Sequence, residues 1–301
     1  MQQLSQGWEK ESGLILGNIG IQDSLHLASS SGSRYFCRKK MNESPAVGLL
    51  PNTKLPTIFL LLLLSLNLFA PNQVLAQKKV TDYSQSWYSV STILRFSDHW
   101  GMVGDLHLRL DDFMADNYFY LVIAGATYYI SGKYPVVAGL AHLWQAPPDG
   151  SKTWGNENRI FEQWSGTQKE GIVTILNRIR FEQRWKDQIV NDQVVGNKVL
   201  TYRLRYLASF EARPFKNPKI PGLVVSDEAF VQFGESIVYN TFDQNRLFFG
   251  LKQSLTKKLS FDIGYLNILQ QKSSGNSYTA SHLFRLFFYY NADLRKQADV
   301  K

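Results

Sequence analysis

Residues 177–185 alternate between charged and apolar side chains with a period of two. The charged positions of this stretch are Arg178, Arg180, Glu182 and Arg184. Residues two apart in a β-strand share a face, so the pattern predicts a strand with one ionic face and one mostly apolar face. Residues 202–213 repeat the pattern in the next segment. Neighbouring strands of this kind are typical of a closed barrel with lipid outside and a polar lumen inside.

Similar alternation, rich in aromatic and β-branched residues, continues along the chain. The expected strands are residues 87–96, 101–111, 118–130, 135–145, 156–168, 172–185, 199–213, 223–233, 242–255, 259–270 and 281–290. Each has about 10–15 residues, enough to cross an outer membrane when tilted. Their joints mostly alternate between short turns and longer loops, including a long polar loop over residues 186–198, as in outer-membrane barrels.

Both ends of an exported barrel chain should lie in the periplasm, which requires an even number of passages through the membrane. These eleven segments therefore leave one passage unaccounted for. Residues 77–86 could supply the missing passage, as a short extra strand or as a segment threading the lumen. Ten extended residues reach about 33 Å, which suffices for either path. The sequence therefore predicts an all-β fold, a transmembrane antiparallel up-and-down β-barrel of about 12 strands, with ten as the lower bound.

The longest apolar run, residues 57–69, is shorter than the roughly 20 residues that a membrane-spanning helix needs. Lys54 precedes it, and Val74 and Ala76 flank Leu75 in an A-x-A-like cleavage pattern. We predict that residues 41–76 are a signal peptide cleaved after Ala76. The remaining residues 77–301 are then the barrel, delivered to a bacterial outer membrane.

Residues 1–40 are polar and show no clear period, so we predict a non-native or disordered leader. Met41 is then the natural start of the signal peptide, and the choice between Met1 and Met41 stays open. The single cysteine, Cys37, lies in this leader. The mature chain consequently has no disulfide or thiolate chemistry.

The charged faces of the strands supply the candidate functional residues of the barrel. Those expected to line the lumen are Glu157, Arg159, Arg178, Arg180, Glu182, Arg184, Arg203, Arg205, Glu211, Arg213, Glu228, Gln244, Arg246 and Asp262. Buried charges must be paired, so these residues can brace a structural barrel through Arg–Glu networks. Alternatively, their surplus of guanidinium can line a small pore that attracts a small anionic solute. Both interpretations stay open at this stage.

A lipid-modifying hydrolase of the outer membrane is the alternative from another class of protein. Its candidate bases and nucleophiles are His99, His107, His142, His282, Ser165, Ser209 and Ser226. No Gly-x-Ser-x-Gly motif occurs in the barrel region, and no spacing links any of these serines to a histidine. We therefore predict no catalytic residues. Histidines and carboxylates do not cluster at metal-ligand spacing, so the sequence predicts no metal site and no cofactor.

The net charge and the aromatic content of the chain indicate which kinds of partner to expect. The net charge is +8, which could suggest nucleic-acid binding, but the arginines alternate with apolar residues instead of forming one exposed patch. We therefore expect no nucleic-acid partner. Aromatic residues make up 14% of the chain and gather near the ends of the alternating runs, as aromatic girdles do. The expected partners are outer-membrane lipids and the barrel-assembly machinery, with a soluble periplasmic barrel or sandwich as the alternative.

Six short motifs follow one another along the predicted barrel. They are ENRIFEQ (residues 157–163), RIRFEQR (178–184), SDEAF (226–230), FDQNRL (242–247), GYLN (264–267) and FYYNADL (288–294). Together they resemble a family of uncharacterised Gram-negative outer-membrane β-barrels catalogued as domain of unknown function 2490. The resemblance extends over residues 80–296. It implies a barrel in the outer membrane and brings no activity, because the family has none assigned.

Overall fold

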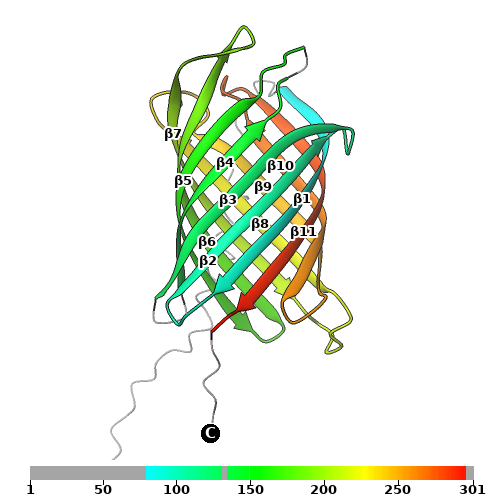
Figure 1. Cartoon of the computed structure of the whole chain (residues 1–301). Coiled ribbons are helices and arrows are strands. Elements are labelled where there is room, and N and C mark those ends of the chain that lie inside the picture. The colour runs from blue at the N-terminus through cyan, green and yellow to red at the C-terminus, as the bar shows by residue number, and fades with distance from the viewer. Residues whose placement is uncertain (1–78, 131–133, 149, 296–301) are drawn as a thin grey trace, which may run out of the picture. The chain divides into compact units, whose positions relative to one another are not determined.

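The computed structural model describes residues 79–130, 134–148 and 150–295, which form a closed barrel of eleven β-strands (Figure 1). The strands are β1 (Lys79–Arg95), β2 (Trp100–Asp111), β3 (Asp116–Ile130), β4 (Tyr134–Gln145), β5 (Gly155–Glu170), β6 (Val173–Val190), β7 (Gln193–Ala212), β8 (Gly222–Phe233), β9 (Phe242–Ser254), β10 (Leu259–Gln271) and β11 (Ser277–Asp293). The prediction of an all-β barrel is confirmed. Among the described residues, no helix is long and apolar enough to cross a membrane.

Strands adjacent in sequence pair in antiparallel fashion around the barrel, and β1 closes it by pairing with β11 in parallel. The parallel closure follows from the odd strand number, since alternation gives the first and last strands the same direction. Eleven strands fall within the predicted range but are one fewer than the favoured twelve. Single-chain bacterial outer-membrane barrels have even strand numbers as a rule, and the eleven strands of this barrel depart from that rule.

The expected extra passage at residues 77–86 is wrong for the described part of that segment. Residues from Lys79 onward are already the first half of β1, which continues without a break to Arg95. Parallel pairing with β11 runs from Lys79 opposite Ser277 to Arg95 opposite Asp293. The weak alternation of residues 79–86 reflects a strand end at the rim, where neither side faces a uniform environment.

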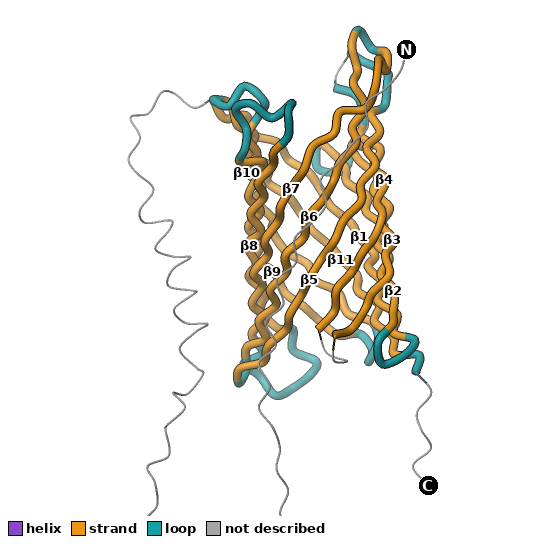
Figure 2. Tube along the Cα trace, turned by 90° about the vertical axis from the view of Figure 1, so that its left-hand side faces the viewer, coloured by secondary structure: helices purple, strands orange, loops and turns teal. Residues whose placement is uncertain are grey.

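The long polar loop expected over residues 186–198 is also wrong, because β6 and β7 continue through it as a hairpin. They meet in a two-residue turn at Asn191 and Asp192, whose φ angles are 50° and 59°. Positive φ at both central residues is the type I′ geometry that matches the twist of paired strands. The hairpin rises above the neighbouring strand ends (Figure 1), and loops join the strands at both ends of the barrel (Figure 2).

The barrel interior contains two apolar clusters beside its charged residues. The first cluster consists of Phe119, Leu121, Ile123, Val137, Ala141, Leu143 and Phe161, and the second of Trp87, Val224, Phe248, Leu266, Ile268 and Leu283. Phe161 is 1% exposed and lies over Gly139, where an added Cβ would come within 2.5 Å of the Phe161 ring. The Phe161 ring thus occupies space in the lumen that Gly139, on the neighbouring strand β4, leaves free.

Several sequence-based predictions lie outside the described residues. These are the leader (residues 1–40), the signal peptide (41–76), its cleavage after Ala76 and the site of Cys37.

The β6–β7 hairpin is fixed to the loop that joins β4 and β5. The Asp192 carboxylate accepts hydrogen bonds from the backbone amides of Lys152, at 2.9 and 3.0 Å, and Thr153, at 2.8 Å. The hydrogen bond from the Thr153 amide, followed by that from the Lys152 amide, holds the pKa of the Asp192 carboxyl below its ordinary value. The contact is therefore complete above pH 3.8, the ordinary value, and is lost as pH falls through the lower folded value.

We expect the amide proton of Thr153 to titrate with a midpoint below pH 3.8, because its resonance reports the ionisation of Asp192. Nuclear magnetic resonance of the refolded barrel measures this midpoint. The Asp192→Asn variant is the control and should abolish the titration. A midpoint at or above 3.8 in the unaltered chain would contradict the proposed docking contact.

Candidate functional site

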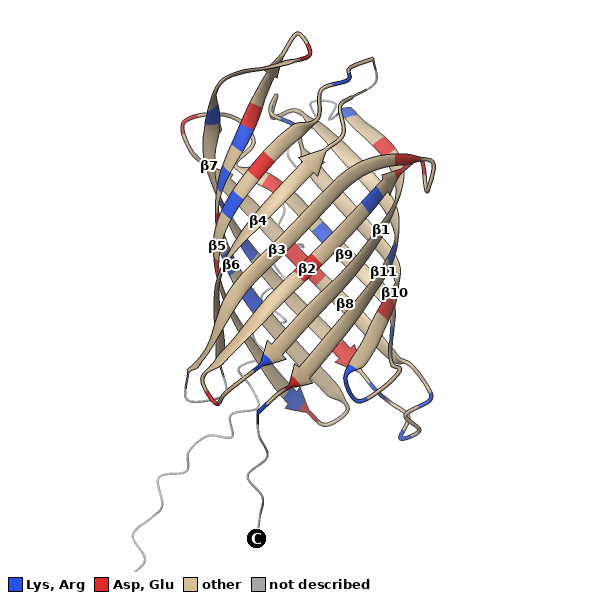
Figure 3. Ribbon diagram, in the orientation of Figure 1, with Lys and Arg blue, Asp and Glu red and all other residues tan. Residues whose placement is uncertain are grey.

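The lumen has a charged wall and an apolar wall. Charged residues lie on β5 to β9, whereas the central parts of β3 and β4 carry none (Figure 3). Between the walls lies an internal cavity of about 1080 Å³, lined by residues of all eleven strands. Among the residues predicted to line the lumen, those that border this cavity are Glu157, Arg159, Arg178, Arg180, Arg184, Arg203, Arg205, Glu211, Glu228, Gln244, Arg246 and Asp262.

The two remaining predicted residues occupy different places. Glu182 is 1% exposed and lies beneath the surrounding arginines. Arg213 follows the end of β7 and donates from Nε to Glu211 Oε1 at 2.7 Å. Lys252 donates to the other oxygen of Glu211 at 2.9 Å, so Glu211 is held by two cations near the lower rim.

Glu182 is the centre of the charged network. Arg203 Nε donates to its Oε2 at 2.8 Å, and Arg205 Nη1 donates to its Oε1 at 2.7 Å. Arg180 approaches the same carboxylate at 3.9 Å and donates from Nε to Gln163 at 2.8 Å. One buried carboxylate is therefore shared by three guanidinium groups, one from β6 and two from β7.

The network extends from Glu182 in both directions. Arg205 also donates from Nε and Nη2 to Glu228 Oε1, at 3.0 and 2.8 Å, and Arg178 donates to the same oxygen at 2.7 Å. On the other side, Arg203 Nη1 donates to Asp243 Oδ2 at 2.9 Å. The resulting chain of ion pairs joins four neighbouring strands, β6 to β9.

A second group of ion pairs lies on β5 and β6. Glu157 is 1% exposed and accepts from Arg159 Nε at 2.6 Å. It also accepts from Arg184, through Nε at 2.6 Å and Nη2 at 3.0 Å, in a bidentate pair. Such charge-assisted, bidentate bonds are among the strongest hydrogen bonds in proteins and fix the relative orientation of both groups.

Strand register explains part of this arrangement. Glu182 stands directly opposite Arg203, an attractive cross-strand pair. Arg180 stands opposite Arg205, a repulsive pair that the shared carboxylate of Glu182 offsets. Because the side-chain period is two, a slip of one residue between β6 and β7 would turn these charges outward. The network thus specifies the register as well as filling the lumen.

Sequence reasoning missed several members of the lumen. Asp262, which was predicted, accepts from Arg285 Nη2 at 2.8 Å and from the Tyr289 hydroxyl at 2.6 Å. Arg285, Tyr289 and Asp243 were not predicted, although Arg285 and Tyr289 share one face of β11 at even spacing. The aromatic sequence around them hid the alternation. Asp243 turns inward only because the β8–β9 register shifts between Phe230 and Val231.

Two further lumen arginines have aromatic partners instead of carboxylates. Arg109 lies between Trp87 and Phe119, with its guanidinium carbon 3.7 and 3.9 Å from the two ring centroids. Arg246, which was predicted, lies 5.0 Å from Trp87 and 4.5 Å from Phe230. Within the described part of the chain, no carboxylate oxygen comes within ion-pair distance of either guanidinium.

The candidate catalytic residues do not form a nucleophilic pair. Ser165, Ser209 and Ser226 border the internal cavity. His142 and His282 are exposed on the outer side of the barrel, where they bond to Asn158 and Tyr265, each at 2.6 Å. No imidazole in the described residues is hydrogen-bonded to a serine hydroxyl.

The remaining two histidines differ in environment. His107 borders the cavity and packs against the edge of Phe287 at 5.6 Å, and His99 lies in the turn after β1 near Tyr129. The described residues contain no group of three or more His, Cys, Asp or Glu side chains placed to hold a metal ion.

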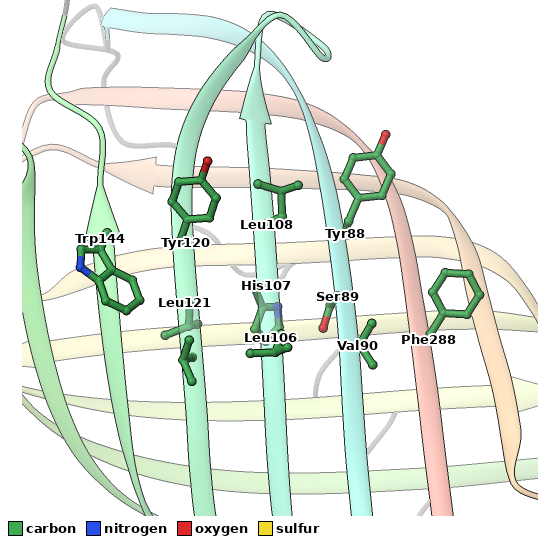
Figure 4. A pocket seen from close by; sticks show the side chains of 11 residues that line it. Tyr88, Ser89, Val90, Leu106, His107, Leu108, Tyr120, Leu121, Trp144 and Phe288 are labelled. Atoms are coloured by element: carbon green, nitrogen blue, oxygen red, sulfur yellow. The ribbon is translucent and has the colours of Figure 1, made fainter.

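The outer face of the barrel is apolar and exposed. Leu106 and Leu140 are 58% and 63% exposed, and many other large apolar side chains of this face are exposed with them. In a water-soluble sheet, side chains as exposed as these are mostly polar. A shallow hollow of about 550 Å³ crosses β1 to β4 and β11, with Tyr88, Tyr120 and Trp144 around it (Figure 4). An exposed apolar surface of this extent marks contact with a partner or a membrane.

Polar side chains on this outer face are paired across neighbouring strands. Asn245 donates to Asp227 at 2.6 Å, and the Tyr206 hydroxyl donates to Asn177 at 2.7 Å. Glu162 differs, since it is exposed on the outer side of β5 and makes no hydrogen bond or ion pair within the described structure. Pairing satisfies the hydrogen-bonding groups that lie among the apolar side chains of this face.

Comparison with known proteins agrees with the motifs found in the sequence. A family model described as "Protein of unknown function (DUF2490)" matches residues 84–279. The chain belongs to this family. The family prediction is thereby confirmed. No curated protein and no solved structure matches this DUF2490 barrel.

We expect the Glu182→Gln substitution to lower the free energy of unfolding of the DUF2490 barrel by about 3–5 kcal/mol, because it leaves buried guanidinium groups without their shared counter-ion. Urea unfolding of the refolded barrel measures the change.

The matched control for this substitution is Asp98→Asn. Asp98 pairs with Arg295 at 2.6 Å, but its side chain is 75% exposed. Loss of such a surface pair should change the free energy of unfolding by about 0–1 kcal/mol. Equal effects of the two substitutions would show that the lumen network does not stabilise the fold.

Proposed function

We propose that this protein is an outer-membrane β-barrel whose narrow aqueous lumen prefers small anions. The observation that carries the proposal is the inverted distribution of polarity, with charged residues buried inside and large apolar residues exposed outside. A water-soluble barrel would expose the charges and bury the apolar side chains. The strands have 12–20 residues, enough to cross the apolar layer of an outer membrane when tilted.

The proposal includes the route and the partners of the barrel. A signal peptide in residues 41–76, cleaved after Ala76, would deliver the chain, and the barrel-assembly machinery would insert it. Outer-membrane lipids would then cover the exposed apolar face. Tyr88, Tyr120 and Trp144 fit this location, because aromatic side chains with a polar atom prefer the membrane–water interface (Figure 4).

The lumen supports a passage with a preference for anions. Its cavity is lined by residues from one end of the barrel, such as Lys272 and Tyr83, and from the other, such as Lys252 and Asn291. The two ion-pair groups contain six arginines for four carboxylates: Arg159, Arg178, Arg180, Arg184, Arg203 and Arg205 against Glu157, Glu182, Glu228 and Asp243. Surplus guanidinium inside a narrow lumen attracts anions and repels cations.

Membrane residence is testable through Glu162, which the proposal places against lipid. We expect Glu162→Leu to raise the free energy of unfolding in a bilayer by about 1–2 kcal/mol, because a carboxylate on the lipid-facing surface is costly. Urea titration of the barrel refolded into vesicles gives this value.

The matched control is Glu170→Leu on the same strand. Glu170 is exposed at the end of β5 and accepts from Gln168 at 2.9 Å. It lies at the rim, so its replacement should change the stability little. A loss of stability in Glu162→Leu, or recovery of the unaltered chain in the soluble fraction, would contradict the membrane location.

The passage itself is tested by conductance in planar bilayers. Under a KCl gradient, the unaltered barrel should show a reversal potential of the sign that anions produce. Arg180→Gln should reduce that potential, because Arg180 borders the cavity with only a distant carboxylate at 3.9 Å. Lys257→Gln, at the exposed turn between β9 and β10, is the control and should leave it unchanged.

Absence of conductance in a correctly inserted barrel would contradict the passage and would support a purely structural barrel closed by its ion pairs. Heat-modifiable gel mobility distinguishes that outcome from failure to fold.

A further inference from the structure

Two guanidinium groups share one indole ring inside the lumen. The guanidinium carbons of Arg109 on β2 and Arg246 on β9 lie 3.7 and 5.0 Å from the centroid of Trp87. Trp87 is 4% exposed and its Nε1 donates to Gln85 at 3.2 Å, so the ring is fixed in place. The two cations are thereby held close together by a rigid support.

Neither guanidinium has a carboxylate within ion-pair distance among the described residues, because Glu228, which stands opposite Arg246, is bonded to Arg178 and Arg205. Arg246 donates from Nε to the amide oxygen of Gln244 at 3.1 Å, which carries no net charge. Arg109 makes no hydrogen bond within the described structure, and its Nε is buried without a partner. Native structures rarely leave a buried donor unsatisfied, so such a group calls for an explanation.

Aromatic rings lie against both guanidinium groups but accept none of their hydrogen bonds. The ring centroid of Phe119 lies 3.9 Å from the guanidinium carbon of Arg109, and that of Phe230 lies 4.5 Å from the guanidinium carbon of Arg246. A guanidinium donates in its own plane, through five N–H groups, whereas a ring stacks on its face. Both arginines also border the internal cavity. The terminal Nη groups of both arginines make no hydrogen bond within the described residues and are therefore the donors available to a solute there.

The same cavity offers apolar surface beside this pair of cations. Leu121, Ile123 and Leu143 line it from β3 and β4, and Leu266 and Phe287 line it from β10 and β11. An inorganic anion would leave this surface in contact with water. A solute with an acidic head and an apolar body would cover it, and burial of apolar surface adds to affinity.

We propose that Arg109, Arg246 and Trp87 form a binding site for an organic acid, with its carboxylate on the two guanidinium groups and its apolar body along β3 and β4. The site deepens the proposed anion preference and rests on that function for its biological meaning. Its binding chemistry depends only on the barrel interior. A bridging carboxylate would offset the repulsion between the two cations and accept the unused donors of Arg109.

Calorimetric titration of the full chain, refolded in a zwitterionic detergent, tests the site with 4-phenylbutyrate as the probe. We expect saturable binding to the unaltered barrel. Arg109→Gln and Arg246→Gln should each weaken it about tenfold or more, the loss expected for one charge-assisted hydrogen bond. If one variant does not fold, as judged by heat-modifiable gel mobility, the other reports on the same site.

Matched controls separate this site from general attraction by a positive lumen. Arg213→Gln removes the same charge from an arginine that is paired with Glu211 at 2.7 Å, and it should leave the affinity unchanged. The neutral analogue 4-phenylbutanol and the head group alone, as acetate, should each bind about tenfold more weakly or not at all.

Three results would overturn the inference. They are the absence of saturable 4-phenylbutyrate binding, an equal loss of affinity in Arg213→Gln, and acetate binding as tight as that of 4-phenylbutyrate. None of these results bears on the proposed passage, because the conductance and reversal potential are measured without the probe. Conversely, a barrel that binds the probe but does not conduct ions would contradict the proposed passage and support the binding site.

Discussion

Confinement of charge in a narrow lumen is the constraint on which the rest of this structure depends. Side chains fill the interior of this eleven-stranded barrel except for a cavity of about 1080 Å³, so guanidinium and carboxylate groups that face inward and are buried must pair with one another. Glu182 shows how this is achieved, since Arg203 and Arg205 both bond to it across the β6–β7 pair. Breaking the alternation of β6 by one residue would send these charges to the apolar face. The ion pairs and the strand register therefore stabilise each other.

The sequence predicts which face each strand residue takes, but it does not predict which residues become partners. Alternation placed Arg178, Arg205 and Glu228 together on the inner side, where the structure has them. The register sets Glu228 opposite Arg246, yet Glu228 bonds to Arg205 and to Arg178, fifty positions earlier in the chain. Long side chains reach diagonally across tilted strands, so pairing depends on the tilt and stagger of the whole barrel. Neither quantity is encoded in any single segment.

Errors in the predicted elements have physical causes of the same kind. Residues 186–198 show no regular alternation because the β6–β7 hairpin extends beyond the neighbouring strands (Figure 1), where the barrel no longer has an inner and an outer face. Without alternation, a strand has the composition of a loop, and only the positive φ angles at Asn191 and Asp192 mark the turn. Similarly, the polar start of β1 gave no sign that it would close the barrel by pairing in parallel with β11.

The outer polar pairs show that satisfaction of hydrogen bonds governs both faces of the wall. Asp227 and Asn177 lie on the side that the alternation assigns to apolar residues, and each has a partner on the neighbouring strand. An unpaired donor or acceptor on a weakly polar surface costs far more than a paired one contributes. The partners of each pair lie on neighbouring strands, 18 and 29 residues apart in the sequence. They therefore cannot be predicted from the sequence until the strand register is known.

The unequal walls of the lumen explain why some arginines lack a carboxylate. On the charged wall, every lumen guanidinium except that of Arg246 has an acidic neighbour, but β1 and β3 supply aromatic rings where Arg109 enters the lumen. Stacking on an aromatic face stabilises a cation by about 0.5–2 kcal/mol, which holds the side chain in place without neutralising it. A carboxylate at that position would satisfy the donors permanently and close the cavity. Aromatic support instead fixes the guanidinium groups and leaves their donors for a group that can enter and leave.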